Sequence, residues 1–324
     1  MKILITGGSG FIGSYIVKKF LSKKHTVLNL DKLSTFSQKL NIKSKNYIFK
    51  KIDLLDKKKL MRIFNNFSPD IIINAAAESH VDRSIVSPSY FFENNLIGTI
   101  NILNLCKERK KIKLIHISTD EVFGSLKKNE KKFTSSSNYD PRSPYSASKA
   151  ASDHAVRSYG ETYNLNFNIT NCSNNYGPFQ YPEKLIPVVI LSCMNNTQIP
   201  VYGNGLNIRD WIHVSDHVEA IYEICFSKFN RKTFLIGGNN EVSNINIIKL
   251  ICKEFDKINK SKNSKRLIRY VKDRAGHDFR YAINNREIYS KLKWRPKIKF
   301  HQGLRETILF YMKNHKNLKN IFIG

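Results

Sequence analysis

Near-continuous apolar runs alternate with amphipathic segments through the first half of the chain. Strands that helices cover on both faces have this apolar character, and such runs occupy residues 2–6, 26–31, 47–53, 70–77, 113–119 and 166–170. Segments with apolar residues at helical spacing lie between them, at residues 11–22, 57–67, 95–109 and 144–164. Strands that alternate with helices predict an α/β fold with a doubly wound, parallel Rossmann sheet.

The pattern changes beyond Cys172, where shorter apolar segments are interrupted by Pro178, Pro182, Pro187 and Pro200. We therefore expect residues 1–171 to form a dinucleotide-binding Rossmann domain, with returning segments at about 209–238. Residues 172–208 and 239–324 are expected to form a second, smaller α/β domain that binds the substrate.

Composition narrows the class of protein. The 324 residues are 41% hydrophobic and 25% charged, which is typical of a globular chain with a substantial core. No apolar run reaches the roughly 18 residues of a membrane helix, and the first residues, MKILITGG, enter a strand without a secretory pattern. The five cysteines are scattered and the nine histidines show no ligand spacing. We therefore expect no metal and a reducing, cytoplasmic location.

The formal net charge of +28 is unusual. A charge of this size can indicate a nucleic-acid or membrane partner. The lysines, however, occur in small groups along the whole chain, such as Lys57 to Lys59, and no basic patch contains interleaved aromatic residues. We interpret the charge as a compositional bias and expect neither partner, although a positive field would favour an anionic substrate.

A glycine-rich turn, TGGSGFIG at residues 6–13, joins the first strand to the first helix. Its glycines allow a tight turn and a close approach of the backbone to a pyrophosphate, whose charge the helix N-terminus favours. Asp31 ends the second strand, where a carboxylate can bind the adenosine ribose and repel a 2′-phosphate. This combination predicts a site for NAD rather than NADP.

Tyr145 and Lys149 stand four residues apart in the segment PYSASKAASDH, so both project from one face of the predicted helix. A free tyrosine, with a pKa of about 10, is a poor base. A neighbouring ammonium group would lower the tyrosine pKa and favour the phenolate. Downstream of a nucleotide-binding turn, this pair indicates a base that deprotonates a sugar hydroxyl beside the nicotinamide.

Two adjacent acids, Asp120 and Glu121, follow the apolar strand KLIHIST. A buried carboxylate without partners is costly, so the pair is either a solvated strand end or a pair of functional groups. Two neighbouring carboxyl groups in different protonation states can act as a general acid and a general base.

Further motifs extend over essentially the whole chain. They are AAAESHVDRS (75–84), STDEVFG (118–124), SPYSASKAASDH (143–154), TNCSNNYGP (170–178), PEKLIP (182–187), YGNG (202–205), RDW (209–211) and DRAGHD (273–278). With the glycine turn and the Tyr-xxx-Lys pair, they resemble the extended short-chain dehydrogenase/reductase family and, within it, the nucleotide-sugar 4,6-dehydratases.

The resemblance implies an NAD-dependent hydro-lyase that converts dTDP-glucose to dTDP-4-keto-6-deoxyglucose, for deoxysugar or rhamnose synthesis. In such a reaction C4 is oxidised, water is eliminated across C5 and C6, and hydride returns to C6. By the resemblance, Glu121 is the base at C5 and Asp120 the acid at the C6 hydroxyl. Tyr145, Lys149 and Thr119 act at C4.

Other site residues follow from the resemblance by position. The implied cofactor residues are Gly7, Gly10, Phe11, Ile12, Gly13, Asp31, Lys32, Leu33, Ser34, Asp53, Leu54, Ala75, Ala76, Ala77, Asn94, Tyr145, Lys149 and Asn175. The implied substrate residues are Ser79, Thr119, Asn174, Lys184, Leu185, Pro200, Tyr202, Arg209, Asn244, Asp273, Arg274 and His277. The resemblance also implies a homodimer, for which the helices near 95–109 and 144–164 are the candidates.

Three alternatives remain open from the sequence. The same reaction could use UDP-glucose or another NDP-hexose, because thymine and uracil differ by one methyl group, worth about 1–3 kcal/mol in a pocket. A nucleotide-sugar 4-epimerase would keep Tyr145 and Lys149 but does not need Asp120 and Glu121. A non-catalytic NAD-binding protein associated with nucleic acid would explain the charge but not the complete catalytic set.

Overall fold

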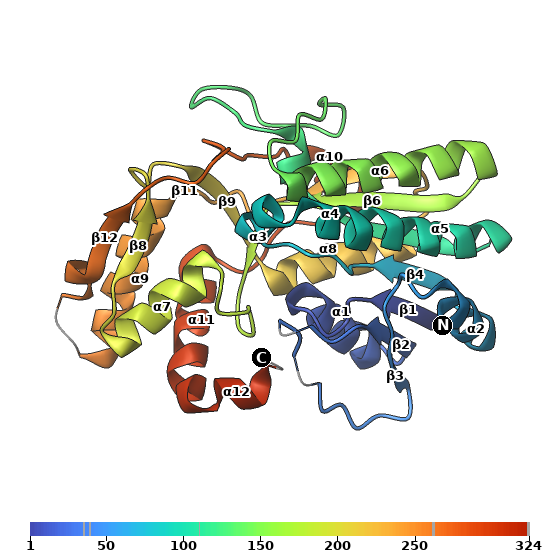
Figure 1. Cartoon of the computed structure of the whole chain (residues 1–324), viewed down its shortest axis with the longest axis horizontal. Helices are drawn as coiled ribbons and strands as arrows, with labels where there is room; N and C mark the ends of the chain where they lie inside the picture. Colours follow the sequence, from blue (N-terminus) through green and yellow to red (C-terminus); the bar gives the residue numbers. More distant parts are fainter. Residues whose placement is uncertain (35, 39, 110, 261–262, 323–324) are drawn as a thin grey trace.

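The computed structural model describes residues 1–322 except residues 35, 39, 110, 261 and 262. Its main sheet has seven strands in the order β10-β6-β5-β4-β1-β2-β3, and all neighbouring strands run parallel. Helices cover both faces of this sheet (Figure 1). The predicted α/β class with a doubly wound parallel sheet is confirmed.

The first half of the chain provides six of these strands and most of the helices that cover them. In chain order the elements are β1 (Lys2–Thr6), α1 (Phe11–Ser22), β2 (Thr26–Asp31), β3 (Tyr47–Lys51), α2 (Lys57–Phe67), β4 (Ile71–Asn74), α3 (Val81–Val86), α4 (Pro88–Phe92), a π-helical turn (Glu93–Ile97), α5 (Gly98–Glu108), β5 (Lys113–Thr119), a 3₁₀ turn (Asp120–Phe123), α6 (Pro144–Tyr163) and β6 (Asn166–Cys172).

The second half is divided between the main sheet and two small sheets. Its elements are β7 (Asn174–Tyr176), α7 (Leu185–Asn195), β8 (Ile199–Tyr202), β9 (Ile208–His213), α8 (Val214–Phe226), β10 (Lys232–Ile236), β11 (Glu241–Ser243), α9 (Asn244–Asn259), a 3₁₀ turn (Ser264–Leu267), β12 (Ile268–Val271), α10 (Arg286–Leu292), α11 (Phe300–Asn314), a 3₁₀ turn (His315–Asn317) and α12 (Leu318–Ile321).

The predicted elements of the first half are present, with shorter strand ends in two cases. β3 stops at Lys51 and β4 at Asn74. Beyond each of these residues the chain continues as a loop at the carboxyl ends of the strands. The sequence did not predict α3 and α4. These helices have six and five residues, which is too short for a hydrophobic period to be recognised.

The segment at 209–238, expected to return to the first domain, lies in two places. α8 contacts α1 on one face of the main sheet, and β10 pairs with β6 at the edge of that sheet. β9, in contrast, pairs with β7 and β11 in a separate three-stranded sheet. The chain therefore crosses from one sheet to the other where β9 leads into α8.

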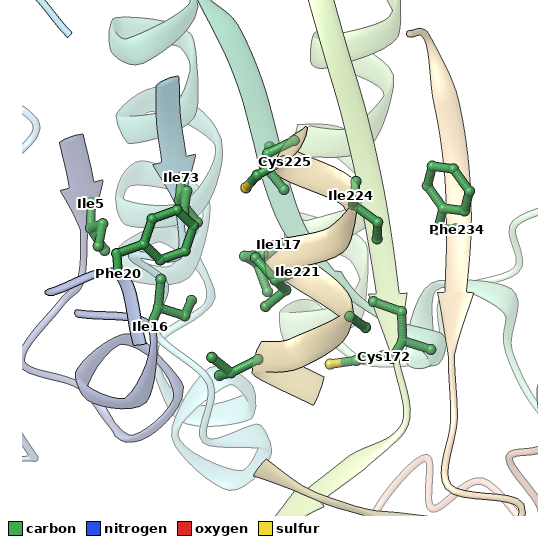
Figure 2. Packing of buried hydrophobic residues seen from close by; sticks show 14 of the residues in the cluster. Ile5, Ile16, Phe20, Ile73, Ile117, Cys172, Ile221, Ile224, Cys225 and Phe234 are labelled. Carbon is green, nitrogen blue, oxygen red and sulfur yellow. The ribbon is translucent and has the colours of Figure 1, made fainter. Parts of the chain in front are cut away.

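Figure 2 shows the packing of α1 and α8 against one face of the main sheet. Ile5 and Ile73 from the strands meet Phe20 of α1, and Ile221 of α8 lies close to Ile117 of β5 in the same cluster. Successive strand residues point to opposite faces, so Leu4 joins a second cluster, with residues of α2, α5 and α6. In the described part of the chain, no helix combines the length and apolar character that membrane crossing requires.

A third hydrophobic cluster holds the second half together, away from the main sheet. Ile190 of α7, Ile248 of α9 and Ile308 of α11 meet Val201 of β8 in this cluster. These elements lie on the left of Figure 1, with the two-stranded sheet β12-β8.

Phe20 offers a test of the main core, because its side chain is fully buried. Phe20→Ala should lower the free energy of unfolding by about 3–5 kcal/mol, since it removes apolar contacts and leaves a cavity. Urea unfolding measures this loss. Phe49→Ala is the matched control, because Phe49 lies on the edge strand β3 and is 37% exposed. Equal losses in the two variants would contradict this description of the core.

Candidate active site

A cavity opens at the carboxyl ends of the central strands of the main sheet. β1 lies between β2 and β4, so the chain leaves β1 toward one edge of the sheet and later returns on the other side. In open α/β sheets, such a switch point is where ligands bind. Segments from the glycine turn, β4, β5 and α6 line this cavity together.

The cavity brings together most of the predicted site. Its lining includes Gly7, Gly10, Phe11, Ile12, Gly13, Asp31, Lys32, Ser34, Asp53, Leu54, Ala75, Ala76, Ala77, Ser79, Asn94, Thr119, Asp120, Glu121, Tyr145, Lys149, Asn174, Asn175 and Lys184. Leu33 is the one predicted cofactor residue outside this lining.

The glycine turn leaves no room for side chains. Gly7 has a φ of +67°, and a Cβ at this position would lie 2.7 Å from Ala76 Cα. A Cβ at Gly13 would lie 2.0 Å from Gly7 O. These close approaches hold the start of α1 against the end of β1 and leave a cradle of bare backbone beside the cavity.

The first turn of α1 and the carboxylate of Asp31 face this cradle. No side chain caps α1 at its N-cap residue, Gly10, so the first-turn amides are available to an anion. Asp31 Oδ2 accepts a hydrogen bond from Ser9 N at 2.9 Å, and its Oδ1 accepts one from Leu33 N at 2.8 Å. The bare backbone, the uncapped helix and the fixed carboxylate fit the pyrophosphate and ribose of a dinucleotide.

Lys32 is held by the opposite wall of the cavity. Its Nζ lies 2.8 Å from Glu78 Oε1 and donates to Tyr90 OH at 2.8 Å and to Asn94 Oδ1 at 2.7 Å. Glu78 is 8% exposed, so this ion pair is largely removed from water. The contact also fixes the position of Asn94.

Tyr145 and Lys149 lie on the cavity side of α6, as expected. The Ser143 hydroxyl caps this helix by accepting a hydrogen bond from Ser146 N at 3.1 Å, with Pro144 in the first turn. Lys149 is 3% exposed, and its Nζ donates to Ile117 O at 2.8 Å. The lysine therefore connects α6 to the carboxyl end of β5.

The two adjacent acids line the cavity, with Asp120 buried and Glu121 half-buried, so the pair is not a solvated strand end. β5 ends at Thr119, and the 3₁₀ turn begins with Asp120 and Glu121. Thr119 Oγ1 accepts a hydrogen bond from Glu121 N at 3.3 Å. Asp120 is 2% exposed, and among the described residues its Oδ2 has no hydrogen-bond partner. A buried carboxyl oxygen without a partner is costly and is available to a ligand.

The surroundings give the two acids different charge preferences. Burial and the neighbouring Glu121 carboxylate raise the pKa of Asp120 well above its usual value. Burial also raises the pKa of Glu121, but Arg209 and Lys184 act in the opposite direction. Asp120 therefore favours the protonated form, while cations support the carboxylate of Glu121. The two groups titrate as a pair.

The expected lowering of the Tyr145 pKa is not found in the protein alone. Burial raises this pKa well above its usual value, and the charge of Glu121 adds to the effect. Burial also lowers the pKa of Lys149, against the opposing charge of Asp153. The sequence prediction considered only the attraction between ammonium and phenolate, whereas the loss of hydration is the largest influence on Tyr145 here.

Arg209 of β9 lies outside the cavity lining but acts on it electrostatically. Its guanidinium donates to the carbonyl oxygens of Ile208 at 2.8 Å, Asp278 at 3.0 Å and Phe279 at 3.4 Å. It also lies 4.2 Å from the ring centroid of Tyr281. From this position its positive charge opposes the rise that burial causes in the pKa of both acids.

The other predicted substrate residues that lie outside this lining come from the second half of the chain. They are Leu185, Pro200, Tyr202, Asn244, Asp273, Arg274 and His277. Arg274 Nε lies 2.6 Å from Asp82 Oδ1 of α3. Lys184 of the cavity lining donates to Ser79 O at 2.8 Å. These two contacts join the second half to the loop and helix that follow β4.

A family model described as GDP-mannose 4,6 dehydratase matches residues 4–307. The chain belongs to this family. The match includes the glycine turn, both acids and the Tyr145–Lys149 pair, and it agrees with the dehydratase resemblance of the sequence.

Curated relatives match over nearly their whole length. The dTDP-glucose 4,6-dehydratase of Neisseria meningitidis serogroup B is 41% identical, over 100% of this chain and 96% of the relative. The dTDP-glucose 4,6-dehydratase 1 of Escherichia coli K12 is 42% identical with the same coverage of both chains.

Solved structures extend the comparison to the fold. The dTDP-glucose 4,6-dehydratase of Bacillus anthracis in complex with NAD is 38% identical, with a TM-score of 0.88 over 98% of both chains. A UDP-glucose 4-epimerase of Thermus thermophilus in complex with NAD is 28% identical, with a TM-score of 0.87 over 96% of this chain and 99% of the epimerase. Dehydratases and epimerases thus share this fold, and the site must distinguish them.

Sequence reasoning missed several residues of the cavity lining. They are Leu30, Phe36, Ser37, Ile52, Glu78, Arg83, Ile117, Ser118, Cys172, Ser173, Gln180, Tyr181 and Glu183. The rule that ligands bind at the carboxyl ends of parallel strands would have indicated Leu30, Ile117, Ser118 and Cys172. Phe36, Gln180 and Tyr181 lie in loops whose sequence carries no comparable signal.

Asp120→Asn should increase thermal stability, by an amount that grows with pH. In the unfolded chain this carboxyl ionises near pH 3.9, whereas the folded protein raises its pKa. Ionisation therefore favours the unfolded state above about pH 4, and an amide removes that effect.

Melting followed by circular dichroism should give nearly equal Tm values for wild type and Asp120→Asn at pH 4 and a higher Tm for the variant at pH 8. Asp140→Asn, at an exposed position, is the control. A difference that does not change with pH would contradict the raised pKa of Asp120.

Proposed function

We propose that the protein catalyses the NAD-dependent dehydration of dTDP-glucose to dTDP-4-keto-6-deoxyglucose. The observation that carries this proposal is the Asp120–Glu121 pair, with Asp120 buried and Glu121 half-buried, in the same cavity as Tyr145 and Lys149. Relatives about 41–42% identical are named dTDP-glucose 4,6-dehydratase, which supports the substrate. A 4-epimerase acts at C4 alone and would leave the two acids of the cavity without a role.

The residues around the glycine turn suit NAD. The uncapped first turn of α1 would bind the pyrophosphate. Asp31 would accept hydrogen bonds from the adenosine ribose and repel the 2′-phosphate of NADP. Bound NAD supplies a positive charge and a reversible hydride acceptor, so the overall reaction involves no net reduction.

Tyr145 acts as the base at C4. Its phenolate takes the proton of the C4 hydroxyl, and Thr119 hydrogen-bonds the same part of the sugar. Lys149 supports the phenolate with its positive charge, against the burial that raises the Tyr145 pKa. The resulting ketone makes the proton at C5 acidic enough to be removed.

Glu121 and Asp120 then remove water across C5 and C6. Glu121, whose carboxylate is favoured by Arg209 and Lys184, takes the proton from C5. Asp120, whose raised pKa favours its protonated form, gives a proton to the departing C6 hydroxyl. The C6 hydroxyl leaves as water with the proton of Asp120. The hydride taken from C4 would then return to C6, while Glu121 gives its proton back to C5. The C4 hydroxyl proton held by Tyr145 replaces, through solvent, the proton that Asp120 lost, so the net loss is one water.

The nucleotide and its diphosphate are assigned to the second half of the chain. Lys184, Arg209, Arg274 and His277 would provide positive charge and hydrogen-bond donors for the diphosphate. We therefore assign cofactor binding to residues 1–171 with α8 and β10. Nucleotide-sugar binding is assigned to residues 172–208 and 239–324, together with β9, which carries Arg209.

A cytoplasmic homodimer is the assembly that we propose. α5 and α6 contact each other on one face of the main sheet and could form a helix bundle with a second copy. Ile97, at the start of this helix pair, is 39% exposed. A monomeric mass in sedimentation analysis would reject the dimer.

The substrate is tested by incubating the purified protein separately with dTDP-glucose and UDP-glucose, without added NADH. Mass spectrometry should find a product lighter by one water, formed faster from dTDP-glucose. Faster conversion of UDP-glucose would change the nucleotide, and conversion to a galactose isomer of unchanged mass would indicate an epimerase. No change in either substrate would reject the proposal.

Two variants separate the first oxidation from the elimination. Glu121→Gln should lower turnover by about 10²–10⁴-fold, because general base catalysis at C5 is lost. It should still form some 4-keto sugar, lighter by two hydrogens rather than by one water. Tyr145→Phe should form neither product. Full turnover in Glu121→Gln would exclude Glu121 as the base, and normal activity in Tyr145→Phe would exclude the phenolate.

A further inference from the structure

A buried carboxylate, Asp153, lies on α6 one turn beyond Lys149. It is fully buried and does not line the cavity. Its Oδ2 accepts hydrogen bonds from Tyr139 OH at 2.7 Å, Ser118 Oγ at 2.9 Å and Asn171 Nδ2 at 3.2 Å. A carboxylate is rarely buried to this degree without a reason for its charge, and the reaction described above gives it no role.

The other carboxyl oxygen of Asp153 faces a histidine. His116 Nε2 lies 3.3 Å from Asp153 Oδ1. His116 Nδ1 lies 3.1 Å from Asn74 Nδ2, which can only donate, so Nδ1 is the acceptor and the ring hydrogen is on Nε2. Burial lowers the pKa of His116. The imidazole at neutral pH is therefore uncharged, and its Nε2 lies near Asp153 Oδ1, although neither atom has a geometrically aligned hydrogen-bond partner among the described residues.

These donors keep Asp153 ionised. Burial alone would raise its pKa, but the neighbouring His116, the positive charge of Lys149 and the hydrogen bond from Tyr139 lower it below its usual value. The negative charge in turn opposes the effect of burial on the Lys149 pKa. The i and i+4 spacing places both side chains on one face of α6.

Asp153 is also connected to the strand that carries the catalytic acids. Ser118, which donates to Asp153, precedes Thr119 at the end of β5. Asn171 Nδ2 donates both to Asp153 Oδ2 and, at 2.9 Å, to Thr119 O. Lys149 Nζ contacts the same strand at Ile117 O. One carboxylate therefore holds a strand end and a helix face together.

We propose that Asp153 is a positioning residue, which fixes the ammonium of Lys149 and the carboxyl end of β5 relative to each other. Its catalytic consequence rests on the proposed function, in which Lys149 supports the phenolate of Tyr145. Its electrostatic consequence does not: without this charge, Lys149 loses its proton at a lower pH whatever the substrate is.

The other titratable groups packed around Lys149 and Asp153 do not replace this charge. Cys172 of β6 has a thiol whose pKa burial raises to about 12, and Tyr139 has a pKa raised by burial, so both are neutral near pH 8. His116 of β5 is uncharged because burial lowers its pKa. Arg157 of α6 donates to Tyr139 OH at 2.8 Å and brings a positive charge.

The test compares the titration of Lys149 in two variants. Asp153→Asn removes the charge and nearly preserves the shape, whereas Tyr139→Phe removes one hydrogen bond to Asp153 and leaves the charge. Nuclear magnetic resonance of protein with ¹³C at lysine Cε follows each lysine, and the Lys149 signal is identified by its absence in Lys149→Met. We expect the Lys149 midpoint to move to lower pH in Asp153→Asn and to remain unchanged in Tyr139→Phe.

Turnover gives the second readout. In Asp153→Asn the alkaline limb of the pH–rate profile should move to lower pH, with a loss of kcat of up to about 100-fold from imperfect positioning. Tyr139→Phe should keep the wild-type limb. A uniform loss at every pH, with an unchanged Lys149 midpoint, would overturn the proposal and assign Asp153 a purely structural role.

Two further outcomes have a defined meaning. If Asp153→Asn does not fold, Asp153→Ser provides the uncharged variant, and failure of both to fold while Tyr139→Phe folds would also overturn the proposal. If wild type shows no dehydration but the Lys149 midpoint still moves in Asp153→Asn, the proposed function fails and the electrostatic role of Asp153 stands.

Discussion

The parallel alignment of the main sheet is the constraint on which the site depends. Because all seven strands run in one direction, every strand delivers its next residues to the same edge. β1 is followed there by the glycine turn, β2 ends in Asp31, and β5 is followed by Asp120 and Glu121. These segments are far apart in the sequence, yet they line one cavity. The helices that separate the strands make this alignment possible, since a parallel connection must cross back over the sheet.

Burial then determines which charge each group carries. In water the two adjacent acids would both be ionised near neutral pH. Inside the cavity Asp120 favours its protonated form, while Arg209 and Lys184 support the carboxylate of Glu121. Behind the cavity, donors from β5, β6 and the loop before α6 keep Asp153 negative beside Lys149. The protein thus holds unlike charge states close together through burial, neighbouring charges and, for Asp153, hydrogen bonds.

The second half of the chain completes the site from a separate core. β9 pairs with β7 and β11 and leads directly into α8 on the main sheet, so Arg209 is carried on the strand that connects the two parts. The C-terminal part of the chain also contacts the first half. Phe322 forms an isolated antiparallel bridge with Gln38, in the segment after β2. α12 lies near this segment in Figure 1. The walls of the cavity are therefore linked at several points outside it.

The sequence by itself determined the alternating strands and helices, the glycine turn before α1, the carboxylate at the end of β2 and the shared helix face of Tyr145 and Lys149. Each of these depends on spacing along a few turns or strands, which local periodicity records. Only the tertiary structure decided that β9 belongs to the second sheet and that Arg209 acts from outside the cavity lining. It also decided that burial raises the pKa of Tyr145. The contacts of Asp153 with His116 and Asn171 likewise depend on the tertiary structure. These features arise from contacts between distant segments and from the loss of water around them, and neither leaves a periodic pattern in the chain.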